Sequence, residues 1–243
     1  SYQLKEVKKA FLSADRLLAV SNELKINLES IFYGANLLWD CLPNIVGEEF
    51  SQNKEYKKYE EFTFLTVTRL EKNKRVELII SSFNDFYKRY GVGFLNIAGQ
   101  GSQYKKLVTL VHDLGISKRV KFLGMLDRKA VNIEMNRSHM FLLSSEYETF
   151  GVVLIEALKC GLPIISTNCG GPKDIVNHYN GMLVDLNTDS YADSMGTMWK
   201  NFNTFSNKLI SQSAEKKYGE KSIVSSLVKH YSELVNQRTK DTL

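Results

Sequence analysis

The chain has 243 residues, of which 43% are hydrophobic and 24% are charged, and its formal net charge is +5. This composition is typical of a soluble globular protein with a buried core, and it argues against a disordered chain. The lysines and arginines are scattered, and no nucleic-acid-binding motif accompanies them, so we expect no nucleic-acid partner. No apolar run approaches the ~18 residues that a membrane-spanning helix requires.

The three cysteines fit reduced thiols in a cytoplasmic protein, because their number is odd and their spacing matches no zinc pattern. The excess of basic residues leaves contact with the inner face of a membrane open as an alternative. The four histidines show no metal-ligand spacing. The sequence begins without a methionine and has no secretory signal, so we expect that an upstream segment was removed or lies elsewhere.

Before residue 62 the pattern is irregular: residues 14–21 suggest a strand, residues 22–30 a short helix, and residues 46–61 a polar linker or exposed loop. After that point short apolar runs recur, and each is continuous rather than alternating, as in strands buried on both faces. These runs are residues 62–67, 93–98, 119–123, 140–143 and 163–167, with a sixth candidate at 181–184.

The helical spacing of apolar residues predicts helices over 76–87, 104–114 and 152–159, and a final helical region over 214–235. Alternating strands and helices indicate a doubly wound parallel sheet of the Rossmann-like α/β class. Such sheets bind ligands beyond the carboxyl ends of their strands, so we expect the chemistry in the loops that follow the apolar runs.

The strongest chemical signal lies between residues 144 and 176. A helix is predicted directly after Gly151, and the unpaired amides at its start form an anion site suited to a diphosphate. Glu148 lies just before this helix and Glu156 lies inside it, with seven residues between them. An ionised carboxylate accepts two hydroxyl hydrogen bonds at once, which suits a ribose or a sugar ring. The pair Gly170–Gly171 allows a ligand to approach the backbone closely.

The segment EYETFGVVLIEA resembles the E-x7-E motif of the large retaining glycosyltransferase family numbered 4, which has the GT-B fold. Four further segments resemble motifs of that family in the same order: VTRLEKNKRVELIISSF, LNIAGQG, RVKFLGMLDR and PIISTNCGGPKDIV. The resemblance implies the donor-binding half of an enzyme that transfers a sugar from a nucleotide diphosphate to an acceptor with retention of configuration. A role in polysaccharide biosynthesis would fit this family.

The resemblance implies a catalytic set of Glu148, Arg69 and Lys74. The two cations would neutralise the donor diphosphate, where negative charge accumulates as the nucleotide leaves. Glu148 would hold the hydroxyls of the transferred sugar, and Glu156 would bind the ribose hydroxyls. The family requires no metal ion, and no nucleophile from this half, because the leaving phosphate assists deprotonation of the acceptor.

The remaining donor contacts implied by the resemblance come from loops and backbone amides. They are Phe150, Gly151, Val152 and Val153 around the sugar and phosphate, Gly99 and Gly101 at a neighbouring turn, and the loop from Met125 to Arg128 against the base. Thr68 and Arg75 depart from the family pattern, which has glycine at both positions. These changes could narrow the pocket or add a phosphate-facing charge.

The resemblance also divides the chain: residues 1–45 would be a remnant of the acceptor domain and linker, 46–205 the nucleotide-sugar-binding domain, and 206–243 the closing helices. The expected partners are a UDP- or GDP-sugar, a glycan, lipid-linked or small-molecule acceptor, and the rest of the acceptor domain outside this chain. Alternatives are a non-catalytic nucleotide-sugar-binding module and an epimerase or phosphorylase of GT-B fold. A dinucleotide-dependent oxidoreductase is disfavoured, because the third glycine and the downstream acidic residue are missing.

Overall fold

A computed structural model describes residues 2–34 and 37–241 of the chain. Its centre is a six-stranded sheet in which every pair of neighbouring strands is parallel, in the order β5-β4-β3-β6-β7-β8. The strands are β3 (Thr63–Val67), β4 (Phe94–Ala98), β5 (Val120–Gly124), β6 (Met140–Leu143), β7 (Ile164–Thr167) and β8 (Gly181–Val184). The predicted doubly wound Rossmann-like sheet is therefore confirmed.

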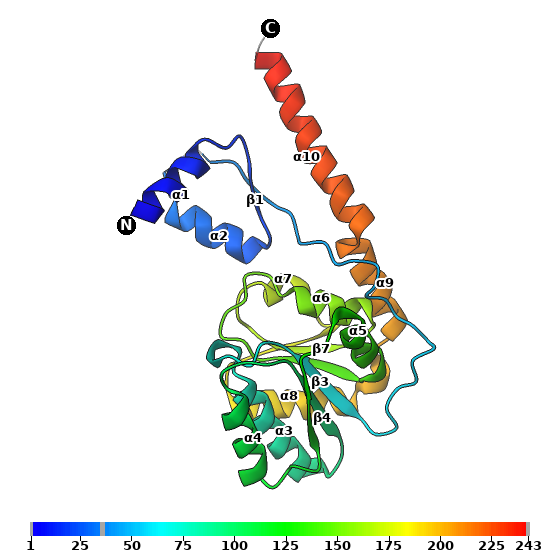
Figure 1. The fold of residues 1–243 in the computed structure, drawn as a ribbon. Helices are drawn as coiled ribbons and strands as arrows, with labels where there is room; N and C mark the ends of the chain where they lie inside the picture. The colour runs from blue at the N-terminus through cyan, green and yellow to red at the C-terminus, as the bar shows by residue number, and fades with distance from the viewer. Residues whose placement is uncertain (1, 35–36, 242–243) are drawn as a thin grey trace.

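Helices cover both faces of this sheet (Figure 1). They are α3 (Val76–Tyr90), α4 (Tyr104–Asp113), α5 (Arg128–Arg137), α6 (Val152–Lys159), α7 (Pro172–Ile175), α8 (Thr188–Lys200), α9 (Asn207–Tyr218) and α10 (Glu220–Asp241), with short turns η1 (Lys72–Lys74) and η2 (Phe202–Thr204). Consecutive side chains of β3 point to opposite faces. Phe64 therefore packs with Phe83 and Tyr191 in one buried cluster, whereas Leu65 packs with Ile155 in another.

The structure agrees with most predicted elements and differs at the carboxyl end. β6, β8 and α6 have the predicted bounds, and α3 runs three residues beyond the predicted end, to Tyr90. The predicted helical region over 214–235 is helical in the structure, but the backbone leaves the helix at Gly219, so the region is divided between α9 and α10. The helices α5, α7 and α8 are not predicted from the sequence.

The segment 46–61 contains no helix or strand, as predicted, but its beginning is not an exposed loop. Val46 and Phe50 are each only 1% exposed and belong to the cluster on the α6 side of the sheet. The ammonium of Lys159, itself buried, donates hydrogen bonds to the carbonyls of Val46 (2.8 Å) and Gly47 (3.0 Å). The start of this segment is therefore fixed against α6.

Residues 2–34 and 37–41 contain a small unit of α1 (Tyr2–Leu12), β1 (Leu17–Ala19), α2 (Asn22–Ile31) and β2 (Trp39–Cys41). Its two strands pair in parallel and do not join the main sheet. Figure 1 shows this unit above α6 and α7, with α10 projecting beyond the main body. Ion pairs fasten it to α10, from Arg16 to Glu233 (2.8 Å) and from Arg238 to Asp15 (2.6 Å).

Candidate functional site

The carboxyl ends of all six parallel strands meet at one edge of the sheet, and two loops at this edge are fastened together. The ammonium of Lys74, after β3, donates a hydrogen bond to the carboxylate of Glu148, after β6. Ser145 donates a second hydrogen bond to the same carboxylate oxygen (3.0 Å), and Ser144 donates to the carbonyl of Lys74 (2.7 Å). The predicted phosphate cation and the predicted sugar carboxylate are thus in direct contact, and both side chains are largely buried.

A glycine turn supports Glu148 from the other side. The amide of Glu148 donates to the carbonyl of Cys169 (2.9 Å), and the amide of Gly171 donates to the carbonyl of Glu148 (2.8 Å). Gly170 has a φ of +99°, and a Cβ added there would lie 2.6 Å from the carbonyl oxygen of Glu148. The Gly170–Gly171 turn is therefore required for packing against the loop that carries Glu148.

The helix α6 begins at this same edge. Gly151 precedes it with a φ of +96°, a conformation that favours glycine, and no side chain caps the helix. The first amides of such a helix point outward without intrahelical partners and favour an anion. Phe150 is buried, whereas Val152 and Val153 are half-buried at the first turn. The four residues predicted to surround the sugar and phosphate, Phe150 to Val153, thus lie at an uncapped helix start.

Glu156 lies in the second turn of α6 and is 8% exposed. Its carboxylate lies 3.5 Å from the guanidinium of Arg128, at the start of α5. Burial raises the pKa of Glu156, while the positive charge of Arg128 acts in the opposite direction. Arg128 is itself held by Glu49, with Nε–Oε1 at 2.8 Å, and it lies over the ring of Phe50 at 4.9 Å. The structure thus adds Glu49 and Phe50 to the predicted site.

Gly99 and Gly101 have a packing role at the end of β4. A Cβ on Gly99 would lie 1.8 Å from the carbonyl oxygen of Thr68, and one on Gly101 would lie 2.4 Å from that of Leu70. The amides of Thr68 and Leu70 donate to the neighbouring turn, at 3.0 and 2.9 Å. Arg69, which lies between these two anchored residues, is exposed. The close packing of the two turns therefore fixes the backbone that carries Arg69.

The structure brings two pairs of predicted site residues into contact, Lys74 with Glu148 and Glu156 with Arg128, although neither pairing is predicted from the sequence. Met125, which is 77% exposed after β5, and the turns that hold Arg69, Gly99 and Gly101 lie at the same edge. No pattern in the sequence indicates a site role for Glu49, Phe50 or Ser145. Arg75 differs from the family pattern, which has glycine at this position, but no partner for its side chain is predicted.

The described part of the chain holds no group of three or more histidine, cysteine or acidic side chains that could bind a metal ion. The three cysteines are not joined by disulfides. His139, one of the four histidines, stacks on Phe62 at 4.9 Å and accepts a hydrogen bond from the amide of Thr63 through Nδ1 (3.1 Å). It is therefore a packing residue. None of the described helices is both long and apolar enough to cross a bilayer.

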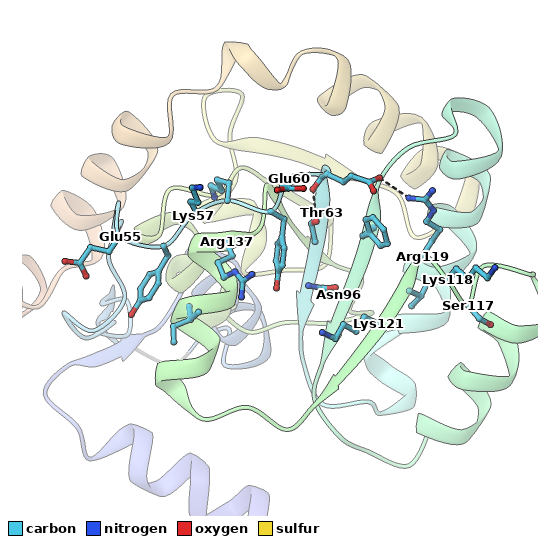
Figure 2. Close-up of a pocket in the computed structure, with 17 residues that line it drawn as sticks. Glu55, Lys57, Glu60, Thr63, Asn96, Ser117, Lys118, Arg119, Lys121 and Arg137 are labelled. Atoms are coloured by element: carbon cyan, nitrogen blue, oxygen red, sulfur yellow. Dashed lines mark hydrogen bonds and ion pairs between the residues drawn. The ribbon is translucent and has the colours of Figure 1, made fainter.

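A groove of about 950 Å³ lies away from this edge, where β3, β4 and β5 begin (Figure 2). Tyr59 donates hydrogen bonds to both carboxylate oxygens of Glu134 (2.8 and 3.0 Å), and the side-chain amide of Asn96 donates to the same group (3.3 Å). These polar groups satisfy one another. None of the predicted site residues lines this groove, so it is separate from the candidate site.

Residues 47–216 match the family described as glycosyl transferases group 1, which is more than half of the chain. The chain therefore belongs to this family. Among curated relatives, it is 35% identical over 143 residues to the N-acetyl-alpha-D-glucosaminyl L-malate synthase of Bacillus anthracis. That match covers 58% of this chain and 37% of the relative, so the chain spans much less than the whole length of that protein.

Two solved structures share the fold. The sucrose-phosphate synthase of Thermosynechococcus elongatus has a TM-score of 0.84 at 18% identity, over 98% of this chain and 63% of that one. The pneumococcal O-GlcNAc transferase GtfA, solved with UDP and GlcNAc, has a TM-score of 0.80 at 19% identity, over 97% of this chain and 47% of that one. These likenesses confirm the GT-B type of architecture predicted for the chain.

Proposed function

We propose that the chain supplies the donor site of a glycosyltransferase that uses a UDP- or GDP-sugar. The observation that carries this proposal is the contact between Lys74 and Glu148 beside the uncapped start of α6. A cation, a carboxylate and outward-facing amides in one place match a ligand that joins a diphosphate to a polyol. Membership of the glycosyl transferases group 1 family supports the same conclusion.

In this proposal each part of the donor meets a different group. Lys74 and Arg69 neutralise the diphosphate, and this stabilisation grows as the nucleotide departs. Glu148 holds the hydroxyls of the transferred sugar, and the amides at the start of α6 hold its phosphate. Glu156 accepts hydrogen bonds from the ribose, and the loop from Met125 to Arg128 faces the base.

The transfer itself would proceed with retention of configuration and without a metal ion. The acceptor hydroxyl attacks the anomeric carbon from the face that the diphosphate leaves, and the departing phosphate takes the hydroxyl proton. This chain then needs no nucleophile of its own; it supplies charge stabilisation and positioning. The unpaired thiols of all three cysteines agree with a reducing compartment such as the cytoplasm.

The acceptor would be bound with the help of a partner segment that completes the amino-terminal unit. A two-stranded sheet is marginal in water and needs further strands or packing. The unit leaves Leu18, Ile26 and Ile31 exposed by 39%, 59% and 69%. Four apolar residues of α10 form a stripe that is also exposed: Val224, Val228, Tyr231 and Val235. We infer that this partner segment covers these side chains and provides the site for a glycan, lipid-linked or small-molecule acceptor.

Thermal unfolding of the chain with UDP, GDP, ADP and their sugar conjugates tests the donor proposal. One nucleotide series is expected to raise the unfolding temperature, because a ligand at 100 times its dissociation constant adds about 2.7 kcal/mol of stability. The Glu156→Ala variant should lose most of that shift, whereas Glu60→Ala, in an exposed loop, should keep it. No shift with any nucleotide in either protein would contradict the proposal.

A second experiment separates a transferase from a non-catalytic binding module and from an epimerase. The chain combined with the segment that completes its amino-terminal unit should consume the nucleotide-sugar only when an acceptor is present. Binding without transfer to any acceptor would favour a binding module. Release of an altered free sugar without an acceptor would favour an epimerase.

A further inference from the structure

Arg75 adopts a backbone conformation that is unusual for its residue type. Its φ is +49° and its ψ is +39°, in the left-handed region between η1 and α3. No other non-glycine residue in the described ranges 2–34 and 37–241 has a positive φ. A side chain with a Cβ is strained there, and such strain persists only where surrounding contacts fix it.

The guanidinium of Arg75 supplies such contacts. Its Nε donates to Glu77 (2.6 Å), a local contact at the start of α3, and one terminal nitrogen donates to Glu146 (2.7 Å), in the loop after β6. The amide of Glu146 in turn donates to the carbonyl of Asn73 (2.9 Å). Glu146 is therefore held to the β3–α3 loop through both its side chain and its backbone.

Both ends of this connection lie next to the candidate donor site. Arg75 follows Lys74 directly, and Glu146 lies two residues before Glu148. Glycine would relieve the backbone strain at position 75 but would remove the connection between the two loops. The hydrogen bond from its side chain to Glu146 therefore explains arginine at position 75, since glycine would fit the backbone conformation with less strain.

We propose that Arg75 is a positioning residue that fixes the loop of residues 144–148 through Glu146 and so holds Glu148 toward the sugar of the donor. This inference rests on the proposed function of the donor site. It assigns Glu146 a role in the site, although that residue lies outside the E-x7-E spacing. In the proposed site Glu148 holds the sugar and Lys74 holds the diphosphate. Because the Arg75–Glu146 pair fixes the loop that carries Glu148, we expect this pair to affect binding of the sugar end of the donor.

The test compares affinities for UDP and UDP-N-acetylglucosamine by calorimetry in the 243-residue chain. Arg75→Gly and Glu146→Gln are each expected to weaken binding of the nucleotide-sugar by about threefold to tenfold. Their affinity for UDP should change much less. The urea midpoint of Arg75→Gly should not fall, since glycine is favoured in the left-handed region. Glu77→Gln is the matched control, because it removes the charge of the other partner of Arg75 and leaves the connection to Glu146.

The exchanged variant Arg75→Glu with Glu146→Arg should restore most of the preference for the nucleotide-sugar. Equal affinities in the wild type, Arg75→Gly and Glu146→Gln would overturn the proposal. Hydrogen exchange in the ligand-free chain provides a readout that needs no donor: both variants should speed exchange of the amides of residues 144–148. If the wild type binds neither ligand, the proposed function fails for this donor. Even in that case, amide exchange of residues 144–148 at the same rate in both variants as in the wild type would overturn the positioning role.

Discussion

The side chains of Lys74 and Glu148 form an ion pair although they lie 74 positions apart in the chain. The pair joins the loop after β3 to the loop after β6, two strands that are neighbours in the sheet. Because only 14% and 17% of the two side chains are exposed, each charge depends on the other for much of its solvation. The two opposite charges thus offset each other at the centre of the candidate site.

The first prediction concerns the energetic coupling of this pair. Lys74→Gln should lower the free energy of unfolding by about 1–2 kcal/mol, because the carboxylate of Glu148 stays behind unpaired. Combining Lys74→Gln with Glu148→Gln should lower the free energy of unfolding by about 1 kcal/mol less than the sum of the two single losses. Urea unfolding of the four proteins measures this coupling. Additive losses would show that the two charges do not stabilise each other.

The same variants should separate the two ends of the donor. Lys74→Gln should weaken binding of UDP and of UDP-sugar alike, since both carry the diphosphate. Glu148→Gln should weaken binding of the sugar conjugate only. Lys72→Ala, an exposed cation in the same η1 turn, is the matched control and should change neither affinity.

The second prediction is that Glu156 strengthens donor binding but lowers the free energy of unfolding at neutral pH. Burial raises its pKa above the usual value of a glutamate, so the folded protein disfavours the charged form. The free energy of unfolding therefore falls as pH rises through the interval between the unfolded and the folded pKa. Glu156→Gln removes this penalty and should be more stable than the wild type at neutral pH, while donor affinity falls about tenfold to a hundredfold.

Arg128 provides a check on this explanation, because its charge lowers the pKa of Glu156. In Arg128→Ala the carboxyl should take up its proton at a higher pH than in the wild type, since only the opposing cation has been lost. On acidification, donor binding by Arg128→Ala should then begin to weaken at a higher pH than donor binding by the wild type. Calorimetry between pH 5 and pH 8 would detect this shift, and identical pH profiles would contradict it.

The sequence predicted the sheet and α6 well because continuous apolar runs and a helix after Gly151 are local signals. It did not predict α5, whose sequence RKAVNIEMNR has few apolar positions, although Asp127 caps that helix through the amide of Ala130. The pairs Arg75–Glu146 and Arg128–Glu49 join residues 71 and 79 positions apart. Such pairs leave no pattern in a single sequence, since any surface arginine or glutamate looks the same before the chain folds.

The third prediction tests the close packing at the turn after β4. Gly99→Ala should lower the free energy of unfolding by about 3 kcal/mol or more, because the added Cβ meets a carbonyl oxygen and the backbone also has a positive φ. Gly115→Ala is the matched control: its φ is +70°, but a Cβ there would meet nothing within 4 Å. It should cost only about 1 kcal/mol. Equal losses in the two variants would mean that close packing at Gly99 contributes little.

The fourth prediction concerns acid stability and His139. Burial, together with the nearby charge of Lys58, lowers the pKa of His139 from 6.5 to about 4. Its Nδ1 accepts a hydrogen bond from the amide of Thr63, which only the neutral ring can do. Between these two pH values the unfolded chain binds more protons than the folded one, so stability rises with pH. The wild type should therefore lose on the order of 2 kcal/mol as pH falls through this interval, allowing for partial exposure of the ring.

The variant His139→Asn isolates this effect, because its side-chain oxygen can take the place of Nδ1 and does not titrate. It should be less stable than the wild type at pH 8, since the stacking on Phe62 is lost. That difference should shrink as the pH falls toward 4, because only the wild type then protonates a buried ring. Urea unfolding of both proteins at several pH values provides the measurement. A difference in stability that stays constant with pH would show that His139 does not titrate in this range.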